Sequence, residues 1–137
     1  MDKEILRLSI NKFLRLYFKS CKEVYKEIGL DKISNKQFRY LNIIYNNENI
    51  TASKFAKIAE LSKPTVTEII NRFIESGLAI KNQSDFDKRV SYISLTTKGE
   101  VLATSNVIES SRFTDNVIAK LNSDELETLS KIFDEME

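Results

Sequence analysis

The apolar residues in the middle of the chain recur at the spacing of an amphipathic helix. Five of them fall at i, i+3, i+4, i+7 and i+8 and so share one face, namely Val66, Ile69, Ile70, Phe73 and Ile74. Ser62 can cap this helix, and Pro64 suits its first turn because its missing N–H would have no partner there. Gly77 suits the left-handed residue that ends a helix. The pattern therefore predicts a helix that begins after Ser62 and ends before Gly77.

A shorter helix is predicted before this one and two strands after it. Thr51 can cap the shorter helix, and Leu61 is an apolar residue in the turn that follows, where we expect its side chain to be buried. The runs Leu78–Asn82 and Val90–Thr96 are rich in β-forming residues and are joined by a charged turn at 84–89. A helix-turn-helix followed by a hairpin with a basic tip is typical of a winged helix, which can place its second helix in a major groove. The alternative is a structural helix pair with a solvated hairpin.

Longer helices are predicted on both sides of this region. Apolar residues at spacings of three and four predict a helix from about Ile5 to Ile28. Three later helix starts have the spacing of a capping box: Ser34 with Gln37, Thr97 with Glu100, and Asn122 with Glu125. In the first, the side chains expected to point inward are Phe38, Leu41, Ile44 and Tyr45; the second is expected to open one long helix. The fold class is therefore predicted as mainly α with a small two- or three-stranded β wing.

The outer helices carry more apolar residues than one neighbouring helix would cover. On the first helix the stripe is widened by Ile5, Leu8, Leu16 and Phe18. In a chain of 137 residues such helices are best explained by packing against the same helices of a second copy in an isologous dimer. We therefore predict that residues of about 1–30 and 100–137 form dimerisation helices; the alternative is a monomer with a compact helical cap.

The wing and its flank read DKRVSYISLTTKG, with an Asp, a basic residue and Arg, then alternating apolar residues, then Leu-Thr and Lys-Gly. This pattern resembles the MarR family of bacterial transcriptional regulators, and the resemblance covers nearly the whole chain. It implies a homodimer on a pseudo-palindromic operator of double-stranded DNA, acting as a repressor that a small-molecule effector releases. It also implies one MarR-like domain over residues 1–137, with a DNA-binding region of about 34–99. The sequence departs from the family at Glu60, where Gly or another turn-tolerant residue is frequent. It departs again at Glu68, an acid on the reading face, by which we mean the polar face of the second helix that is expected to contact the bases.

The second helix and the wing tip supply the candidate DNA contacts. They are Ser62, Lys63, Pro64, Thr65, Thr67, Glu68, Asn71, Arg72, Asp87, Lys88 and Arg89. Side chains near the start of the second helix enter the major groove, where Glu68 can accept from a cytosine amino group or can repel phosphates. Arg89 can enter a narrow minor groove, with Asp87 holding its guanidinium. The alternative for this pair is an exposed ion pair with no role in binding.

Composition narrows the function classes. The chain has no His and 1 Cys, and its 3 Gly are isolated from one another. The commonest general base and metal ligand is therefore missing, and no Gly-rich phosphate loop can form, so we expect no enzyme, no cofactor and no metal site. No signal peptide and no membrane span are recognisable, so we expect a cytoplasmic protein without a membrane partner.

Charge is unevenly distributed, although the net charge is only +1. Residues 1–98 carry 18 Lys and Arg against 11 Asp and Glu, whereas residues 99–137 carry 3 against 9. This asymmetry suits a basic face toward nucleic acid, provided that the two parts of the sequence are also separate in space. The weak net charge and Glu68 favour the competing hypothesis, a winged-helix module that binds protein.

Two further candidate sites lie apart from the DNA contacts. Cys21, with Tyr17 and Tyr25 one turn on either side, is a candidate redox sensor, although a small buried hydrophobe is the commoner role for a lone Cys. A regulator of this family would also have an effector pocket between the dimerising helices and the winged helix. Its candidate lining residues are Phe13, Tyr17, Phe38 and Tyr45, each of which can equally be a core residue.

Overall fold

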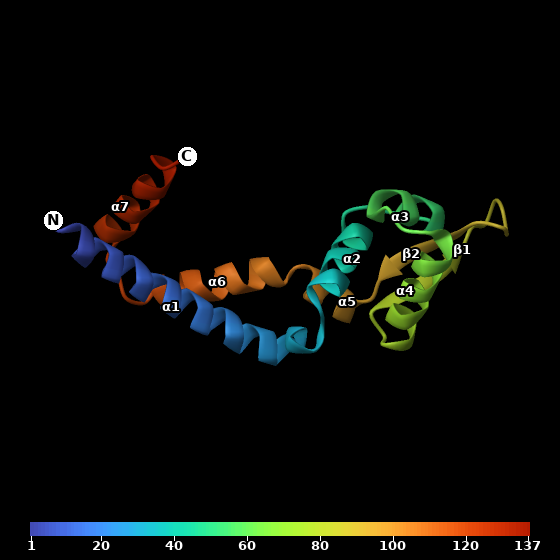
Figure 1. Cartoon of the computed structure of the whole chain (residues 1–137), viewed down its shortest axis with the longest axis horizontal. Coiled ribbons are helices and arrows are strands. Elements are labelled where there is room, and N and C mark those ends of the chain that lie inside the picture. Colours follow the sequence, from blue (N-terminus) through green and yellow to red (C-terminus); the bar gives the residue numbers. More distant parts are fainter. The chain divides into compact units, whose positions relative to one another are not determined.

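The structure, a computed structural model, describes all 137 residues and is mainly helical (Figure 1). Its elements are α1 (Lys3–Ile28), the 3₁₀ turn η1 (Leu30–Lys32), α2 (Asn35–Tyr45), α3 (Ala52–Ala59), α4 (Lys63–Glu75), β1 (Ala79–Gln83), β2 (Ser91–Leu95), α5 (Thr97–Ala103), α6 (Ser105–Ile118) and α7 (Ser123–Asp134). They form two compact units, the winged-helix unit (Tyr25–Ser105) and the helical unit (Met1–Val24 with Asn106–Glu137). The predicted fold class, mainly α with a small β wing, is confirmed.

The winged-helix unit has a continuous apolar core to which every one of its longer elements contributes. Leu41 on α2, Phe55 on α3, Val66 on α4 and Ile93 on β2 are all at most 1% exposed. Burying side chains of this size stabilises a fold by about 1.5–3 kcal/mol each, so these contacts hold the helices of the predicted helix-turn-helix against the wing. The apolar face predicted for α4 is the face that meets this core.

The wing is a two-stranded antiparallel sheet whose base is fixed to the core. Its register pairs Ala79 with Leu95 and Gln83 with Ser91. A single further bridge joins Ile93 to Ile50 in the α2–α3 connection, where the Ile93 N–H donates to the Ile50 carbonyl at 2.8 Å. The base of the wing therefore cannot swing freely against the helix-turn-helix, because its middle residue is both buried and hydrogen-bonded there.

The turn from α4 into the wing has the geometry that Gly77 predicts. Gly77 is left-handed (φ 72°), its N–H donates to the Ile74 carbonyl at 3.0 Å, and the N–H of Leu78 donates to the Phe73 carbonyl at 2.8 Å. These two bonds satisfy the last carbonyls of α4, and buried Leu78 adds the apolar contact that accompanies this cap. The chain thus leaves α4 in one fixed direction and enters β1.

Several predicted helix starts are confirmed. Ser34 and Asn122 each form a capping box, with Gln37 and Glu125 as the reciprocal partners. The Thr51 hydroxyl accepts from the Lys54 N–H at the start of α3.

Three sequence predictions were wrong. The cap of α5 is Thr96 rather than Thr97: its hydroxyl accepts from the Gly99 N–H and also donates to the Gly77 carbonyl at 2.6 Å, a tertiary contact that no local pattern reveals. The long helix expected after the wing is broken at Thr104 (φ −104°, ψ 19°) into α5 and α6. Tyr45, expected to point inward, is 49% exposed at the end of α2, and Ile43 is buried instead.

The helical unit buries much less apolar surface. Phe113 on α6 packs edge-on against Phe13 and Tyr17 of α1, with ring centroids 5.5 and 5.2 Å apart. Many large apolar side chains of this unit remain exposed: Ile5, Leu6, Leu8, Ile10, Phe13, Leu14, Leu16 and Phe18 on α1, Val107 and Ile118 on α6, and Ile132, Phe133 and Met136 toward the C-terminus. None of the helices has the length and apolar character needed to cross a membrane.

Candidate nucleic-acid interface

The start of α4 presents its polar residues to solvent. The Ser62 hydroxyl accepts from the Thr65 N–H at 3.4 Å, and this bond satisfies one of the free N–H groups of the first turn. The same hydroxyl lies 2.7 Å from the Thr65 hydroxyl. Pro64 lies in that turn, as expected. The eight candidate contacts on or beside α4, Ser62, Lys63, Pro64, Thr65, Thr67, Glu68, Asn71 and Arg72, are all exposed. The structure thus places them together on the side of α4 opposite the core.

A hollow of about 380 Å³ lies between the start of α3, the exposed side of α4 and the wing. Three cations line it, Lys63, Lys81 and Arg89, and no acidic side chain does. Hydroxyl and amide groups complete its polar lining: Thr51, Ser53, Thr67, Asn71 and Ser91. Three positive charges and several hydrogen-bond donors around one hollow are the chemistry that receives a phosphate.

Sequence reasoning missed four of these polar lining residues as candidate contacts, namely Ser53, Lys81, Ser91 and Thr51, which was predicted only as a helix cap. Ser53 follows the α3 cap by two positions, and Lys81 and Ser91 lie on the wing strands. The only signal in the sequence is that Lys81 is a cation within a β run, which does not show which face of the wing it occupies. The hollow depends on tertiary packing, because the Ile50–Ile93 bridge and the shared core bring the wing and the start of α3 together.

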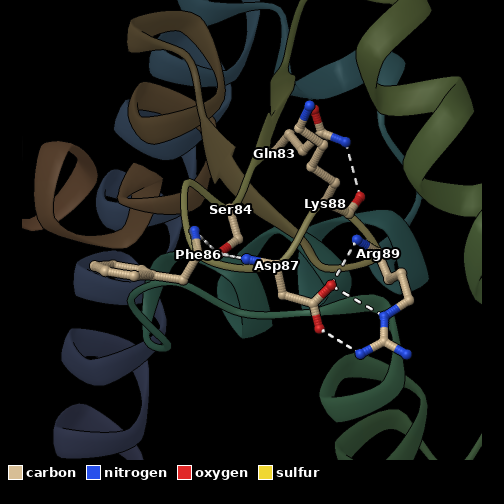
Figure 2. A network of polar contacts seen from close by, with 6 residues as sticks. All are labelled: Gln83, Ser84, Phe86, Asp87, Lys88 and Arg89. Carbon is tan, nitrogen blue, oxygen red and sulfur yellow. Dashed lines mark hydrogen bonds and ion pairs between the residues drawn. The ribbon is translucent and has the colours of Figure 1, made fainter.

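The tip of the wing is ordered by its own hydrogen bonds (Figure 2). Ser84 is 7% exposed, and its hydroxyl accepts from the N–H groups of Phe86 and Asp87 at 3.2 and 3.3 Å. The Ser84 N–H donates to the Val90 carbonyl at 2.8 Å, and the Gln83 amide donates to the Lys88 carbonyl at 2.7 Å. The turn is therefore closed from both strands.

Asp87 and Arg89 form the ion pair that the sequence predicts, and it is bidentate. The Arg89 side chain donates from Nε to Oδ1 and from an Nη to Oδ2 of Asp87, both at 3.0 Å, and the Arg89 backbone N–H donates to Oδ1 at 3.0 Å. The Arg89 side-chain bonds, and then its backbone N–H, hold the pKa of Asp87 below its ordinary value, and Asp87 raises the pKa of Arg89. The Arg89 side chain stays 90% exposed. The direction of the Arg89 guanidinium is therefore fixed by Asp87, while most of its surface stays open to a ligand.

Glu68 and Arg72 neutralise each other on the exposed side of α4. An Nη atom of Arg72 lies 2.6 Å from Oε1 of Glu68, and the two side chains are 69% and 63% exposed. Such an i,i+4 pair adds only a few tenths of a kcal/mol to helix stability. The consequence of the pair is electrostatic, because the positive charge of Arg72 compensates the negative charge of Glu68 on the reading face.

Glu60, the first departure from the family pattern, ends α3 in the left-handed conformation (φ 56°). A side chain is disfavoured there, which gives the physical reason why a turn-tolerant residue is expected at this position.

The remaining candidate residues lie outside this interface. Cys21 is 5% exposed, and burial is the main cause that raises the pKa of its thiol, which opposes the thiolate that a redox sensor needs. Phe13 and Tyr17 belong to the helical unit, whereas half-buried Phe38 and exposed Tyr45 belong to the winged-helix unit. The effector pocket stays a prediction. The structure has no group of three or more Cys, Asp or Glu side chains placed to hold a metal ion.

The charge asymmetry of the sequence is smaller in space. The winged-helix unit has 12 Lys and Arg against 9 Asp and Glu, and the helical unit has 9 against 11. The reason is that α1 contributes all of its basic residues except Lys26 to the helical unit. The basic character relevant to a ligand is therefore the local charge around the hollow.

Comparisons with known proteins agree with this fold. The sequence profile of the MarR family matches residues 33–91. The organic hydroperoxide resistance transcriptional regulator of Bacillus subtilis is 30% identical over 96 residues, which are 67% of this chain and 65% of that protein. A mutant of MepR from S. aureus, solved with a bound oligodeoxyribonucleotide, has a TM-score of 0.64 at 19% identity and covers 93% of this chain and 94% of its own.

A second solved structure is also similar to this chain. FabT of Streptococcus pneumoniae, in complex with DNA, has a TM-score of 0.56 at 22% identity and covers 95% of this chain and 94% of its own. At these identities the two solved structures establish the fold. Membership of the family rests on the family profile and on the B. subtilis relative. The chain therefore belongs to the MarR family of winged-helix transcriptional regulators.

Proposed function

We propose that the protein is a homodimeric repressor that binds a pseudo-palindromic operator in double-stranded DNA. The observation that carries this function is the hollow lined by Lys63, Lys81 and Arg89 without an acidic side chain. A backbone phosphate seated there would position α4 over a major groove, with Thr65, Thr67 and Asn71 toward the bases. Arg89, held by Asp87, would reach the adjacent minor groove.

The exposed apolar surface of the helical unit supports the dimer. Large apolar side chains on all three of its helices are about half exposed or more, among them Leu8, Phe18 and Phe133. So many exposed large apolar side chains in one small unit are typical of a protein–protein interface. A second copy offers the same helices, so an isologous contact covers both sets at once and provides two winged helices for one operator.

Release by a small molecule is the regulatory part of the proposal. The helical unit contains a hollow of about 510 Å³ with a largely apolar lining that includes Phe13, Leu16 and Phe113. Its size and lining suit a small apolar ligand. An action on chromosomal DNA also places the proposed repressor in the cytoplasm.

DNA binding is tested by retention on nonspecific duplex DNA at low salt, followed by selection of bound genomic fragments. The informative variant is Lys81→Gln, because Lys81 lines the hollow, and the matched control is Lys98→Gln, an exposed Lys of the same unit outside it. We expect Lys81→Gln to weaken binding to all sequences alike and to lower the salt dependence by about one unit per protomer, and Lys98→Gln to change neither.

The competing function, a winged-helix module that binds protein, is favoured by the modest excess of positive charge in this unit and by the acid at Glu68. Failure of the wild-type protein to be retained on DNA at low salt would support this second function and contradict the first.

A further inference from the structure

Phe86, at the tip of the wing, is fully exposed, with a relative accessibility of 102%. The other exposed large apolar residues of the winged-helix unit, Tyr45, Ile58 and Ile80, keep about half of their surface covered, at 49%, 39% and 46% exposure. Phe86 thus contributes nothing to the core of its own unit. A complete aromatic side chain is available there for an external partner.

The backbone that carries the ring is nevertheless ordered. The N–H groups of Phe86 and Asp87 both donate to the buried Ser84 hydroxyl, and the Val90 N–H donates to the Asp87 carbonyl at 3.0 Å. These bonds fix the backbone on both sides of Phe86. Because the loop is ordered before binding, a contact made by the ring costs rotamer entropy of the Phe86 side chain but no further ordering of the backbone.

The position of the ring relative to Arg89 restricts the partner. Figure 2 shows the Phe86 ring and the Arg89 guanidinium pointing away from each other on the same six-residue turn. Asp85 and Asp87 flank Phe86 in the sequence, and the charge of Asp87 is compensated by Arg89. Phosphate is therefore an unfavourable neighbour for the ring on the Asp85 side, whereas deoxyribose C–H groups and base faces are favourable ones.

We propose that Phe86 is a DNA contact of the wing, which wedges against a base step in the minor groove while Arg89 contacts the groove on the other side of the turn. This inference rests on the proposed DNA-binding function and extends it. Apolar side chains inserted from the minor groove unstack a step, and pyrimidine–purine steps such as TA and CA yield most easily. Phe86 therefore adds a preference for such a step at the two operator positions that face the wings, outside the bases read by α4.

A single-tryptophan variant tests the contact directly, because the chain has no Trp. Phe86→Trp places the fluorophore at the tip, and Tyr45→Trp, a 49% exposed position at the end of α2 in the same unit and outside the hollow, is the matched control. On addition of a selected operator we expect the Trp at position 86 to be quenched and shielded from acrylamide, and the Trp at position 45 to be unchanged. An equally accessible Trp at position 86 in the complex would overturn the proposal.

Operator selection and salt titration with Phe86→Ala separate this contact from phosphate binding. A lost aromatic stacking contact weakens binding by roughly tenfold without changing the salt slope, whereas loss of Arg89 lowers the slope. Selection with Phe86→Ala should retain the bases read by α4 and lose the flanking pyrimidine–purine step. Wild-type affinity and an unchanged flanking preference would overturn the role of Phe86 alone; failure of the wild type to bind any DNA would overturn this role together with the proposed function.

Discussion

The two compact units differ in how completely they bury their apolar residues. In the winged-helix unit, one core buries Leu41, Phe55, Val66 and Ile93 almost completely. In the helical unit, α1 alone exposes eight large apolar side chains, and the residues that are most buried include polar Ser20 and Glu109. The first unit has the packing of a fold that is stable by itself, whereas the second has the surface of one half of an interface.

The largest effect is expected from removing residues 120–137, which contain α7 and its exposed Ile132 and Phe133. We expect this truncation to abolish dimers in sedimentation experiments, because it removes part of the apolar surface that a second copy would cover. The winged-helix unit should keep its cooperative unfolding. A truncated chain that still sediments as a dimer would contradict the assignment of α7 to the interface.

Two phenylalanines, one from each unit, compare the cores directly. Phe55→Ala should lower the free energy of unfolding by about 3–5 kcal/mol, because Phe55 is fully buried. Phe133 is 50% exposed, so Phe133→Ala should affect folding much less and weaken dimerisation instead. Urea unfolding and sedimentation equilibrium measure the two quantities. Equal losses of folding stability would remove the distinction between the units.

The wing pair tests whether DNA binding belongs to the winged-helix unit alone. Arg89→Ala should weaken operator binding roughly tenfold and lower the salt dependence by about one unit per wing, with the dimer unchanged. Asp87→Ala should also weaken binding, although it removes a negative charge, because Arg89 loses the partner that orients it. Fluorescence anisotropy at matched salt measures both. Tighter binding by the Asp87 variant would show that Asp87 only repels phosphate.

A smaller gain is expected at Glu60, which is left-handed. Glu60→Gly should stabilise the winged-helix unit by up to about 1 kcal/mol, because Gly has no Cβ to strain this conformation. Asn49→Gly is the control at the other left-handed non-Gly residue, where Asn is already tolerant, and should gain less. Thermal unfolding would show the difference, and equal gains would exclude a role for the Glu side chain.

The smallest effect concerns pH. The folded-state pKa of Asp87 is lowered by Arg89, so the pair is fully present above the ordinary carboxyl pKa and is lost as the pH falls through the lowered value. In Arg89→Gln the pKa of Asp87 should rise toward its ordinary value, as measured by NMR titration of the carboxyl group. An identical pKa in both proteins would show that the pair does not persist in solution.

Local chemistry explains why much of the helix-turn-helix could be predicted. The Thr51 and Ser62 caps, the apolar face of α4 and the left-handed Gly77 depend on residues within one or two turns of each other. The Asp87–Arg89 pair was predictable for the same reason, since its members are two residues apart. By contrast, the cap of α5 was misplaced because Thr96 also binds the distant Gly77 carbonyl.

The sequence by itself thus determined the order of the elements, most of their caps and the polar side of α4, because these depend on periodicity and on side chains that bond their own backbone. Only the tertiary structure decided which residues share the hollow, because Ser53, Lys81 and Ser91 come together through the Ile50–Ile93 bridge. It also decided where Tyr45 and Cys21 lie, one exposed and one buried, since the burial of a single residue depends on what packs over it. Long-range packing of this kind leaves no period in the sequence.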